Sequence, residues 1–267
     1  MRRLILFLAL AASVCACKPK LVILHTNDTH SHFEPVRSGE DAGLGGVIER
    51  AAFVDSVRAR YGSDRVLLVH AGDFNQGTPY YSELGGVLEP RVINEFGYDC
   101  ITLGNHEFDN GIEDLCRRLK MLERTTVVCA NLDLSQFELG QYVKPCTVVE
   151  KAGMKIGIIG LETDLSTNVS KTTSSRIPQL DSVEVTNRWA DYLKNEQKCD
   201  IIIVLSHMGY EEDLAIIPQT RHLDMIIGGH THTFVDELAY AEDADGRKVG
   251  VITDGCWGLQ MGELKLW

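Results

Sequence analysis

Short segments, most of them fully apolar and each followed by polar residues, constrain the fold of this chain more than any other sequence feature. They predict strands at residues 21–24, 66–69, 100–103, 127–130, 201–205 and 223–227. Because polar and apolar residues do not alternate along most of them, we expect both faces of these strands to be buried. Strands of this kind occur in layered folds in which helices cover the sheets. The sequence therefore predicts an α/β protein.

Other segments complete this layered pattern. Helical spacing of apolar residues predicts helices at residues 47–61, 90–96, 112–122 and 184–197. Residues 142–161 are rich in β-branched side chains around Ala152 and Gly153, which predicts a β-hairpin, and residues 249–253 and 264–266 predict closing strands. Residues 171–178 form the most loop-like segment. No repeat or low-complexity linker marks a second large domain.

The composition excludes some classes of function. Of the 267 residues, 44% are hydrophobic and 24% are charged, which is close to the average for globular proteins and excludes wholesale disorder. The formal net charge of −12 argues against binding to a nucleic-acid polymer or to an anionic membrane surface, because nothing offsets the repulsion. The charge does not exclude a phosphorylated small molecule as a substrate, because bound metal ions can reverse the charge inside a site.

The first residues resemble a targeting segment. Arg2 and Arg3 precede an apolar run at residues 4–12, and small residues follow, which predicts a secretory signal peptide over residues 1–17. A buried N-terminal strand is the alternative. The segment around Cys17 also resembles a bacterial lipobox, which implies an exported lipoprotein, periplasmic or at the cell surface, that is held at a membrane only by its lipid anchor. Simple secretion is the alternative to the lipid anchor.

The remaining cysteines give no sign of a disulfide framework or a zinc knot. They are Cys100, Cys116, Cys129, Cys146, Cys199 and Cys256. Their spacing is irregular and includes no C-x-x-C pair. Several lie at or beside apolar runs, so we expect them to behave as small buried hydrophobic residues.

Polar side chains follow the predicted strands as a recurring set. The set comprises Asp28, His30, Asp73, Asn105, His106, His207, His230 and His232. Each member alone is weak evidence, because a surface turn or a buried histidine would explain it. Since ligands bind at the carboxyl ends of parallel strands, we expect the set to converge there. Carboxylates, imidazoles and an amide suit zinc, manganese or iron, and there are too many of them for one tetrahedral ion and enough for two.

Ordered sequence blocks around these residues resemble a known family. The blocks are HTNDTH at residues 25–30, AGD at 71–73, GNHEFD at 104–109, SHMG at 206–209 and GGHTH at 228–232. In this order they resemble the calcineurin-like metallophosphoesterases, and the first, third and fifth resemble the 5′-nucleotidase branch in particular. The resemblance implies a sandwich of two β-sheets flanked by helices, in four layers α/β/β/α, with two divalent metal ions at the strand ends.

The resemblance also implies a role for each residue. It assigns one metal ion to Asp28, His30 and His232. It assigns the other to Asn105, His207 and His230, with Asp73 as the bridge between the ions. His106, held by Asp109, is similar to the catalytic pair of the family and lies outside the metal ligands. A bridging carboxylate is expected on physical grounds, because it offsets the repulsion between two cations that are about 3.5–4 Å apart.

The implied function is the hydrolysis of phosphate monoesters, most simply as a 5′-nucleotidase acting on a small nucleotide. Full-length 5′-nucleotidases carry a second, C-terminal domain that holds the nucleoside, whereas residues 18–267 are expected to form the metallophosphoesterase domain alone. A separate chain could supply the substrate domain. Nucleotide-sugar diphosphatase, 2′,3′-cyclic phosphodiesterase and thiosulfohydrolase activities are alternatives within the same chemistry. A structural lipoprotein with incidental ligands is the alternative outside it.

Overall fold

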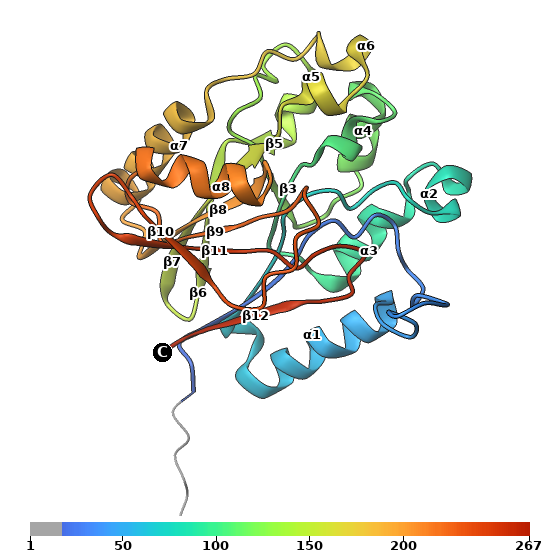
Figure 1. The fold of residues 1–267 in the computed structure, drawn as a ribbon, viewed down its shortest axis with the longest axis horizontal. Coiled ribbons are helices and arrows are strands. Elements are labelled where there is room, and N and C mark those ends of the chain that lie inside the picture. Colours follow the sequence, from blue (N-terminus) through green and yellow to red (C-terminus); the bar gives the residue numbers. More distant parts are fainter. Residues whose placement is uncertain (1–17) are drawn as a thin grey trace, which may run out of the picture.

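The computed structural model describes residues 18–267 as two facing six-stranded β-sheets with helices on their outer sides (Figure 1). The predicted signal peptide and lipobox, at residues 1–17, lie outside the described residues. None of the helices in the described part combines the length and the apolar character needed to cross a bilayer.

The first sheet has the strand order β12-β1-β2-β3-β4-β5. Its strands are β1 (Leu21–Thr26), β2 (Val66–His70), β3 (Cys100–Thr102), β4 (Thr126–Val128), β5 (Val143–Lys144) and β12 (Gly262–Leu266). Strands β1 to β5 run parallel, and β12 pairs antiparallel with β1, with Leu21 opposite Leu266. The carboxyl ends of β1, β2 and β3 therefore lie at the same edge of the sheet.

The second sheet has the order β10-β11-β9-β8-β7-β6. Its strands are β6 (Cys146–Lys151), β7 (Met154–Glu162), β8 (Ile201–His207), β9 (Met225–Ile227), β10 (Ala239–Glu242) and β11 (Lys248–Ile252). Strands β7, β8, β9 and β11 are parallel, and β6 and β10 are antiparallel edge strands. The predicted hairpin joins β6 to β7 through Ala152 and Gly153, whose φ angles of 52° and 77° are those of a two-residue hairpin turn.

Helices cover the outer face of each sheet. The α-helices are α1 (Val47–Tyr61), α2 (Pro79–Leu84), α3 (Leu88–Phe96), α4 (Ile112–Leu119), α5 (Leu165–Asn168), α6 (Lys171–Ser174), α7 (Ser182–Asp191) and α8 (Tyr210–Ile216). Single turns of tighter helix stand at Ser63–Arg65, Asn105–Phe108, Glu138–Gln141 and Ile217–Gln219, and a wider turn, Tyr192–Glu196, extends α7. Helices α1, α3 and α4 pack on the first sheet, and α7 and α8 pack on the second.

The core has three layers of apolar contacts, as a two-sheet sandwich requires. Val22 and Leu24 of β1 pack against the helices of their own sheet, whereas Leu21 and Ile23 pack against the other sheet. The second sheet divides its residues in the same way, with Ile203 facing inward and Ile202 facing α7 and α8. This alternation explains why most of the central strands carry apolar residues on both faces. The predicted α/β/β/α sandwich is confirmed.

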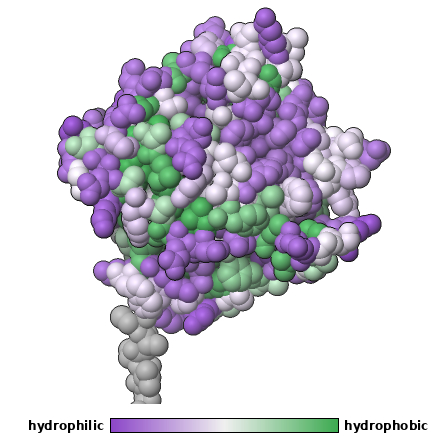
Figure 2. Space-filling view, in the orientation of Figure 1, coloured by the Kyte–Doolittle hydropathy of each residue, from purple (hydrophilic) through white to green (hydrophobic). Residues whose placement is uncertain are grey.

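One side of the sandwich is less completely covered. Strands β10 and β12 are edge strands on this side, and a hollow of about 600 Å³ lies between them. Figure 2 shows hydrophobic side chains surfacing in a band around β12, with hydrophilic side chains around it. Leu264 and Leu266 of β12 are only partly buried there. The metal-ligand candidates lie elsewhere, at the carboxyl ends of the parallel strands.

Most predicted elements are present, with differences at their ends. The helix predicted to reach residue 122 ends at Leu119, and the helix predicted for 184–197 begins at Ser182, where the side chain of Asp181 caps it. The segment 171–178, predicted to be the most loop-like, contains the short helix α6. Helices α2 and α8 and strand β10 were not predicted, because their sequences lack a clear apolar period. All six cysteines of the described residues are free.

Candidate metal centre

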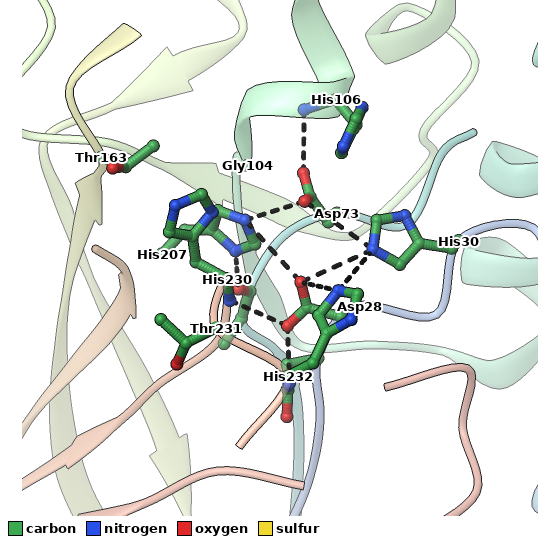
Figure 3. A network of polar contacts seen from close by, with 12 residues as sticks. Asp28, His30, Asp73, Gly104, His106, Thr163, His207, His230, Thr231 and His232 are labelled. Atoms are coloured by element: carbon green, nitrogen blue, oxygen red, sulfur yellow. Dashed lines mark hydrogen bonds and ion pairs between the residues drawn. The ribbon is translucent and has the colours of Figure 1, made fainter. Parts of the chain in front are cut away.

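The predicted site residues gather where strands of both sheets end (Figure 3). The first sheet contributes Asp28 and His30 after β1, Asp73 after β2, and Asn105 and His106 after β3. The second sheet contributes His207 at the end of β8 and His230 and His232 after β9. In Figure 3 the carboxylates of Asp28 and Asp73 lie between the ring of His30 on one side and the ring of His207 on the other.

One group of three side chains consists of Asp28, His30 and His232, whose potential ligand atoms all lie within 4.8 Å of one another. Asp28 Oδ1 is 3.7 Å from His30 Nε2 and 3.4 Å from His232 Nε2. The two histidine nitrogens are 3.0 Å apart. These three residues are the ones that the sequence assigned to one metal ion, and the structure brings them together.

A second group consists of Asp73, His207 and His230. Asp73 Oδ2 is 3.0 Å from His207 Nε2, and the rings of His207 and His230 are 5.2 Å apart. The same Asp73 oxygen is 3.9 Å from His30 Nε2, which belongs to the first group. Asp73 therefore lies between the two groups, at the position that a bridging carboxylate needs.

Asn105 completes the set of candidate ligands. Its side chain is buried, and its Oδ1 atom has no hydrogen-bond partner. Both neighbours of Asn105 in the chain are in contact with Asp73, because His106 N donates to Asp73 Oδ1 over 2.9 Å and a Cβ atom on Gly104 would collide with that same oxygen. The backbone on both sides of Asn105 therefore lies against Asp73, which places Asn105 at the edge of the cluster.

Three buried polar atoms of the cluster lack hydrogen bonds, which supports the presence of cations. They are Asp28 Oδ1, Asn105 Oδ1 and His207 Nε2. The 3.0 Å contact of His207 Nε2 with Asp73 is a close ion pair, but its geometry is not that of a hydrogen bond. A buried polar atom without a partner costs about 1–3 kcal/mol. Since oxygen and imidazole nitrogen are ligands for borderline divalent ions, the residues fit a metal centre.

Glycines bring the backbone close to these side chains. A Cβ atom on Gly72 would lie 2.6 Å from His207 Nδ1, and one on Gly229 would lie 2.8 Å from Asp28 Oδ2. Real Cβ atoms do not approach other atoms so closely, so only glycine fits at these two positions. The glycines in the AGD and GGHTH blocks therefore serve the close packing of the cluster.

The backbone at the cluster is strained. Positive φ angles occur at Asp28 (46°), His30 (46°), Asp73 (54°), His230 (75°) and His232 (53°). Each such conformation costs about 1–3 kcal/mol outside glycine and persists only where surrounding contacts enforce it. Here Asp28 N donates to Gly72 O over 2.9 Å, and His230 N donates to Asp28 Oδ2 over 2.9 Å. Strain of this kind concentrates at functional sites.

Hydrogen bonds also orient the imidazole rings. His207 Nδ1 is 2.7 Å from Ala71 O, and His30 Nδ1 is 3.2 Å from Asn75 O. A carbonyl can only accept a hydrogen bond, so both Nδ1 atoms donate and both Nε2 atoms face the cluster. Metal-binding histidines are held in this way in many proteins.

Charge raises the pKa of two histidines of the cluster. Burial alone would lower the pKa of His207, but the carboxylates of Asp73 and Asp28 outweigh it and raise that pKa well above its usual value. The carboxylate of Asp28, 3.4 Å from His232 Nε2, is the main reason why the pKa of His232 rises to about 10. The cluster therefore attracts positive charge strongly, and metal ions would compete with protons for these nitrogens.

His106 and Asp109 form the predicted pair. His106 also belongs to a third group of potential metal ligands, with His30 and Asp73, although the sequence did not assign it to a metal ion. His106 Nδ1 is 2.9 Å from Asp109 Oδ2, and both side chains are about one-third exposed. This hydrogen bond is the main reason why the pKa of His106 is raised. The ring of His106 lies 5.3 Å from that of His30. His106 is therefore a partly exposed imidazole whose Nδ1 atom is held by Asp109, and its catalytic role stays a prediction.

Glu107 has a larger structural part than its sequence position indicated. Its buried carboxylate accepts hydrogen bonds from Asp73 N, Gly104 N, Asn75 N and Asn75 Nδ2, at 2.6–3.1 Å. Glu107 thereby joins the loop after β2 to the loop after β3. Its place within the GNHEFD block was the only signal in the sequence.

Asn27 is a second residue that the sequence did not single out. Its Nδ2 donates to Asp28 Oδ2 over 2.6 Å and to Gly255 O over 2.7 Å, and its Oδ1 accepts from Asp254 N over 2.8 Å. These bonds join the end of β1 to a loop that is more than two hundred residues away in the chain. The neighbouring position in the HTNDTH block was its only signal.

The remaining histidines lie outside the two groups. His25 is buried, with Nδ1 2.6 Å from Asp254 Oδ2. His70 Nε2 is 3.0 Å from Thr29 Oγ1, and burial lowers its pKa to about 3. His222 lies against Asp191, and His32 stacks on Trp257. The sequence left these four out of the ligand set, and none of them belongs to a group of potential metal ligands in the described residues.

Comparison with known proteins identifies the family. Residues 21–234 match the family model described as "Calcineurin-like phosphoesterase". The chain belongs to this family. The match confirms the family resemblance that the sequence blocks predicted. Calcineurin-like phosphoesterases use divalent metal ions, which agrees with the groups of potential metal ligands.

Similar proteins include several 5′-nucleotidases. The 5′-nucleotidase of Diplobatis ommata is 33% identical over 92% of this chain and 46% of its own length. The snake venom 5′-nucleotidase of Gloydius brevicauda is 33% identical over 96% of this chain and 46% of its own length. The crystal structure of a 5′-nucleotidase precursor from Thermus thermophilus has a TM-score of 0.83 and 34% identity, over 91% of this chain and 50% of that one. The chain spans about half the length of these relatives.

Proposed function

We propose that residues 18–267 form the catalytic domain of a dinuclear-metal phosphohydrolase that cleaves phosphate monoesters, most simply a 5′-nucleotidase acting on a small nucleotide. The observation that carries this proposal is the convergence of two carboxylates and four imidazoles from both sheets, with buried ligand atoms that lack partners. The naming of its relatives as 5′-nucleotidases supports the choice of substrate class.

The two groups of side chains correspond to two metal ions in this proposal. Asp28, His30 and His232 would hold one ion. Asn105, His207 and His230 would hold the other, with Asp73 shared between them. Zinc, manganese and iron suit this mixture of carboxylate, amide and imidazole ligands. The two carboxylates would leave a net positive charge at the centre of an acidic protein, which attracts a phosphate group.

When bound, a pair of divalent ions would attract the phosphate and make water a stronger nucleophile at neutral pH. Residues of the chain position these ions and supply a proton donor. Asp73 keeps the two sites close together, because its Oδ2 faces His207 and His30. His106, protonated with the help of Asp109, donates a hydrogen bond from Nε2 to the phosphoryl group or to the leaving oxygen, where negative charge develops. Asp109 holds the ring of His106 and its positive charge in place.

A second candidate is a catalytic domain that needs residues outside 18–267 to select its substrate. The observation that favours it is that the described domain corresponds to about half of each relative named above. Such residues could belong to a separate chain. Nucleotide-sugar diphosphatase, cyclic phosphodiesterase and thiosulfohydrolase activities would then compete with nucleotidase activity, since the metal centre alone does not distinguish them.

The experiment that tests the function is a substrate panel with Mn²⁺ or Zn²⁺. We expect the turnover of AMP, measured as phosphate release, to exceed the turnover of a nucleotide sugar, a 2′,3′-cyclic nucleotide and a thiosulfonate, each measured by its own hydrolysis product. His207→Ala should abolish it, and His222→Ala, which changes a histidine outside the centre, should not. Equal turnover in wild type and His207→Ala would contradict the proposal. Activity that appears only after addition of a separate substrate-domain chain would favour the second candidate.

We also propose that residues 1–17 direct export and that Cys17 receives the lipid anchor of a periplasmic or cell-surface lipoprotein. The support is the order of basic, apolar and small residues before Cys17. In a bacterial host, wild type should fractionate with membranes, and Cys17→Ser should be released or left unprocessed. Incorporation of a labelled fatty acid into Cys17→Ser as in wild type would contradict the anchor.

A further inference from the structure

The loop that follows β1 directs its side chains alternately to two sides. Asp28 and His30 point into the cluster of candidate metal ligands (Figure 3), whereas Thr29 and Ser31 contact buried side chains of other elements. All four residues are buried. No step of the proposed reaction uses Thr29 or Ser31. The side of the loop that faces away from the metal ligands therefore has partners of its own.

Ser31 is joined to helix α3. Its Oγ atom donates a hydrogen bond to Glu89 Oε1 over 2.5 Å. Glu89 lies in the first turn of α3 and keeps only 2% of its surface exposed. Hydrogen bonds from a hydroxyl group to a carboxylate are short and strong. Glu89 therefore fixes the residue that directly follows the candidate ligand His30.

Thr29 has a buried partner as well. Its Oγ1 atom is 3.0 Å from Nε2 of His70, the last residue of β2. The residues before and after His30 are thus each held by a side chain from a different element of the first sheet and its helices. His30 lies between these two attachments, so its position depends on both of them.

The attachments hold a backbone that is strained. The φ angles of Asp28, His30 and Ser31 are 46°, 46° and 55°. Such angles are uncommon outside glycine and persist only where surrounding contacts enforce them. On one side of the loop, His30 N donates to Asp73 O over 3.0 Å and Ser31 N donates to Phe74 O over 3.1 Å. Loss of the side-chain contacts on the other side should let the loop relax and move His30.

Burying Glu89 costs free energy that an apolar residue would avoid. Among the described residues, Glu89 Oε2 and His70 Nδ1 have no hydrogen-bond partner. Both side chains line an internal cavity of about 20 Å³, whose other walls include Phe74 and Ile93. A leucine at position 89 would fill a similar volume and leave no buried polar atom without a partner. The carboxylate of Glu89 is therefore explained by the group that it binds, the hydroxyl of Ser31.

We propose that Glu89 is a positioning residue of the metal centre, which acts through Ser31 to hold His30 in the geometry that binds one of the two metal ions. The proposal rests on the proposed function for the presence of two ions, and it adds a residue that is not a ligand.

The proposed effect is confined to one ion. In the described part of the chain, no hydrogen bond joins Ser31 or Glu89 to the proposed ligands of the other ion, which are Asn105, His207 and His230. Loss of the contact between Ser31 and Glu89 should therefore weaken the binding of one ion and spare the other.

Calorimetric titration of the metal-free protein with Mn²⁺ tests the proposal without relying on turnover. Wild type should show two binding events. Glu89→Leu and Ser31→Ala should each weaken one event about 10–100-fold, as expected for the loss of a group that orients a metal ligand, and leave the other within about twofold. Glu89→Gln should bind both ions as wild type does, because its amide oxygen can still accept the hydrogen bond from Ser31.

The double variant Ser31→Ala/Glu89→Leu separates positioning from general destabilisation. If Glu89 acts through Ser31, the double variant should weaken the same event no more than the single variants do. The matched control is Asp243→Ala. Asp243 is also a buried carboxylate, and it accepts hydrogen bonds from Asp245 N and Arg247 N in a turn after β10. Its loss should lower stability and leave both binding events unchanged.

Equal weakening of both events in Glu89→Leu, or wild-type binding in both Glu89→Leu and Ser31→Ala, would overturn the positioning role. A double variant in which the two losses multiply would overturn it as well. If Glu89→Leu does not fold, Ser31→Ala, which removes a single oxygen atom, decides by the same criteria. The proposed function fails by a different result, namely no phosphate release from any monoester by a wild type that binds two ions.

Discussion

The inner and outer sides of the metal centre differ in burial. On the inner side, Asp28 and His207 have fully buried side chains, and Asp73 is nearly so. On the outer side, the side chain of His232 is 40% exposed and that of His106 is 31% exposed. The inner residues lie directly at strand ends and are packed against glycines, whereas the outer residues lie on the loops that follow.

This difference in burial indicates that the inner residues hold metal ions and that His106 contacts the substrate. The inner carboxylates and imidazoles are fixed by hydrogen bonds to neighbouring backbone, and such rigid ligands suit the holding of ions. The ring of His106 is partly exposed and is held by Asp109, which suits contact with a substrate that arrives from solvent. Changes to the inner residues should therefore remove metal and activity together, whereas a change to His106, which is not one of the proposed ligands, should remove activity and leave the metal.

The largest effect is expected from Asp73→Asn. Loss of the shared carboxylate removes the charge that lies between the two groups of ligands, so both ions should bind weakly and turnover should fall to the level without added metal. Metal content and phosphate release are measured together. Asp245→Asn, at a surface ion pair with Arg221, is the matched control and should behave as wild type. Wild-type turnover in Asp73→Asn would show that Asp73 is not needed to hold the metal ions.

His106→Asn should lower turnover by about 10²–10⁴-fold, as expected for the loss of a proton donor, and should retain the metal content of wild type. The control is His222→Asn, because His222 is also about one-third exposed and also pairs with an aspartate, 3.1 Å away, but lies outside the centre. If His106→Asn lost its metal, the separation between the inner and outer sides would be wrong.

Asp109→Asn should have a smaller effect that depends on pH. Because the hydrogen bond to Asp109 raises the pKa of His106, its removal should lower that pKa, and less of the protonated form remains as pH rises. Turnover should therefore be closest to wild type at acidic pH and should fall progressively below it as the pH rises, since the variant loses the proton on His106 at lower pH than wild type does. A rate profile of unchanged shape would show that Asp109 does not act through the proton on His106.

Glu107→Gln should have the smallest effect on turnover and a measurable effect on stability. An amide in this position can accept fewer of the four hydrogen bonds that now reach the carboxylate, which costs about 1–3 kcal/mol. Thermal unfolding should shift down by about 5 °C, with metal still bound. Glu184→Gln, at an exposed pair with Arg188, is the control. An unchanged Tm would indicate that the hydrogen bonds of Glu107 do not stabilise the contact between the loop after β2 and the loop after β3.

The sequence predicted the candidate ligands well because each follows an apolar strand, and parallel strands bring their carboxyl ends together. It could not predict how the two sheets face each other, on which the 3.0 Å contact between Asp73 and His207 depends. It also missed Asn27, whose partners lie in a distant loop. The contact between Ser31 and Glu89 escaped prediction for the same reason, since these residues are far apart in the chain and meet only in the folded protein.

The number of metal ions bound by the folded chain decides whether the centre is dinuclear. After saturation with Mn²⁺ or Zn²⁺ and removal of free ions, elemental analysis should find about two ions per chain in wild type and in His106→Asn, and fewer in Asp73→Asn. Circular dichroism establishes that each sample is folded. A well-folded wild-type chain that binds one ion or none would rule out a dinuclear centre.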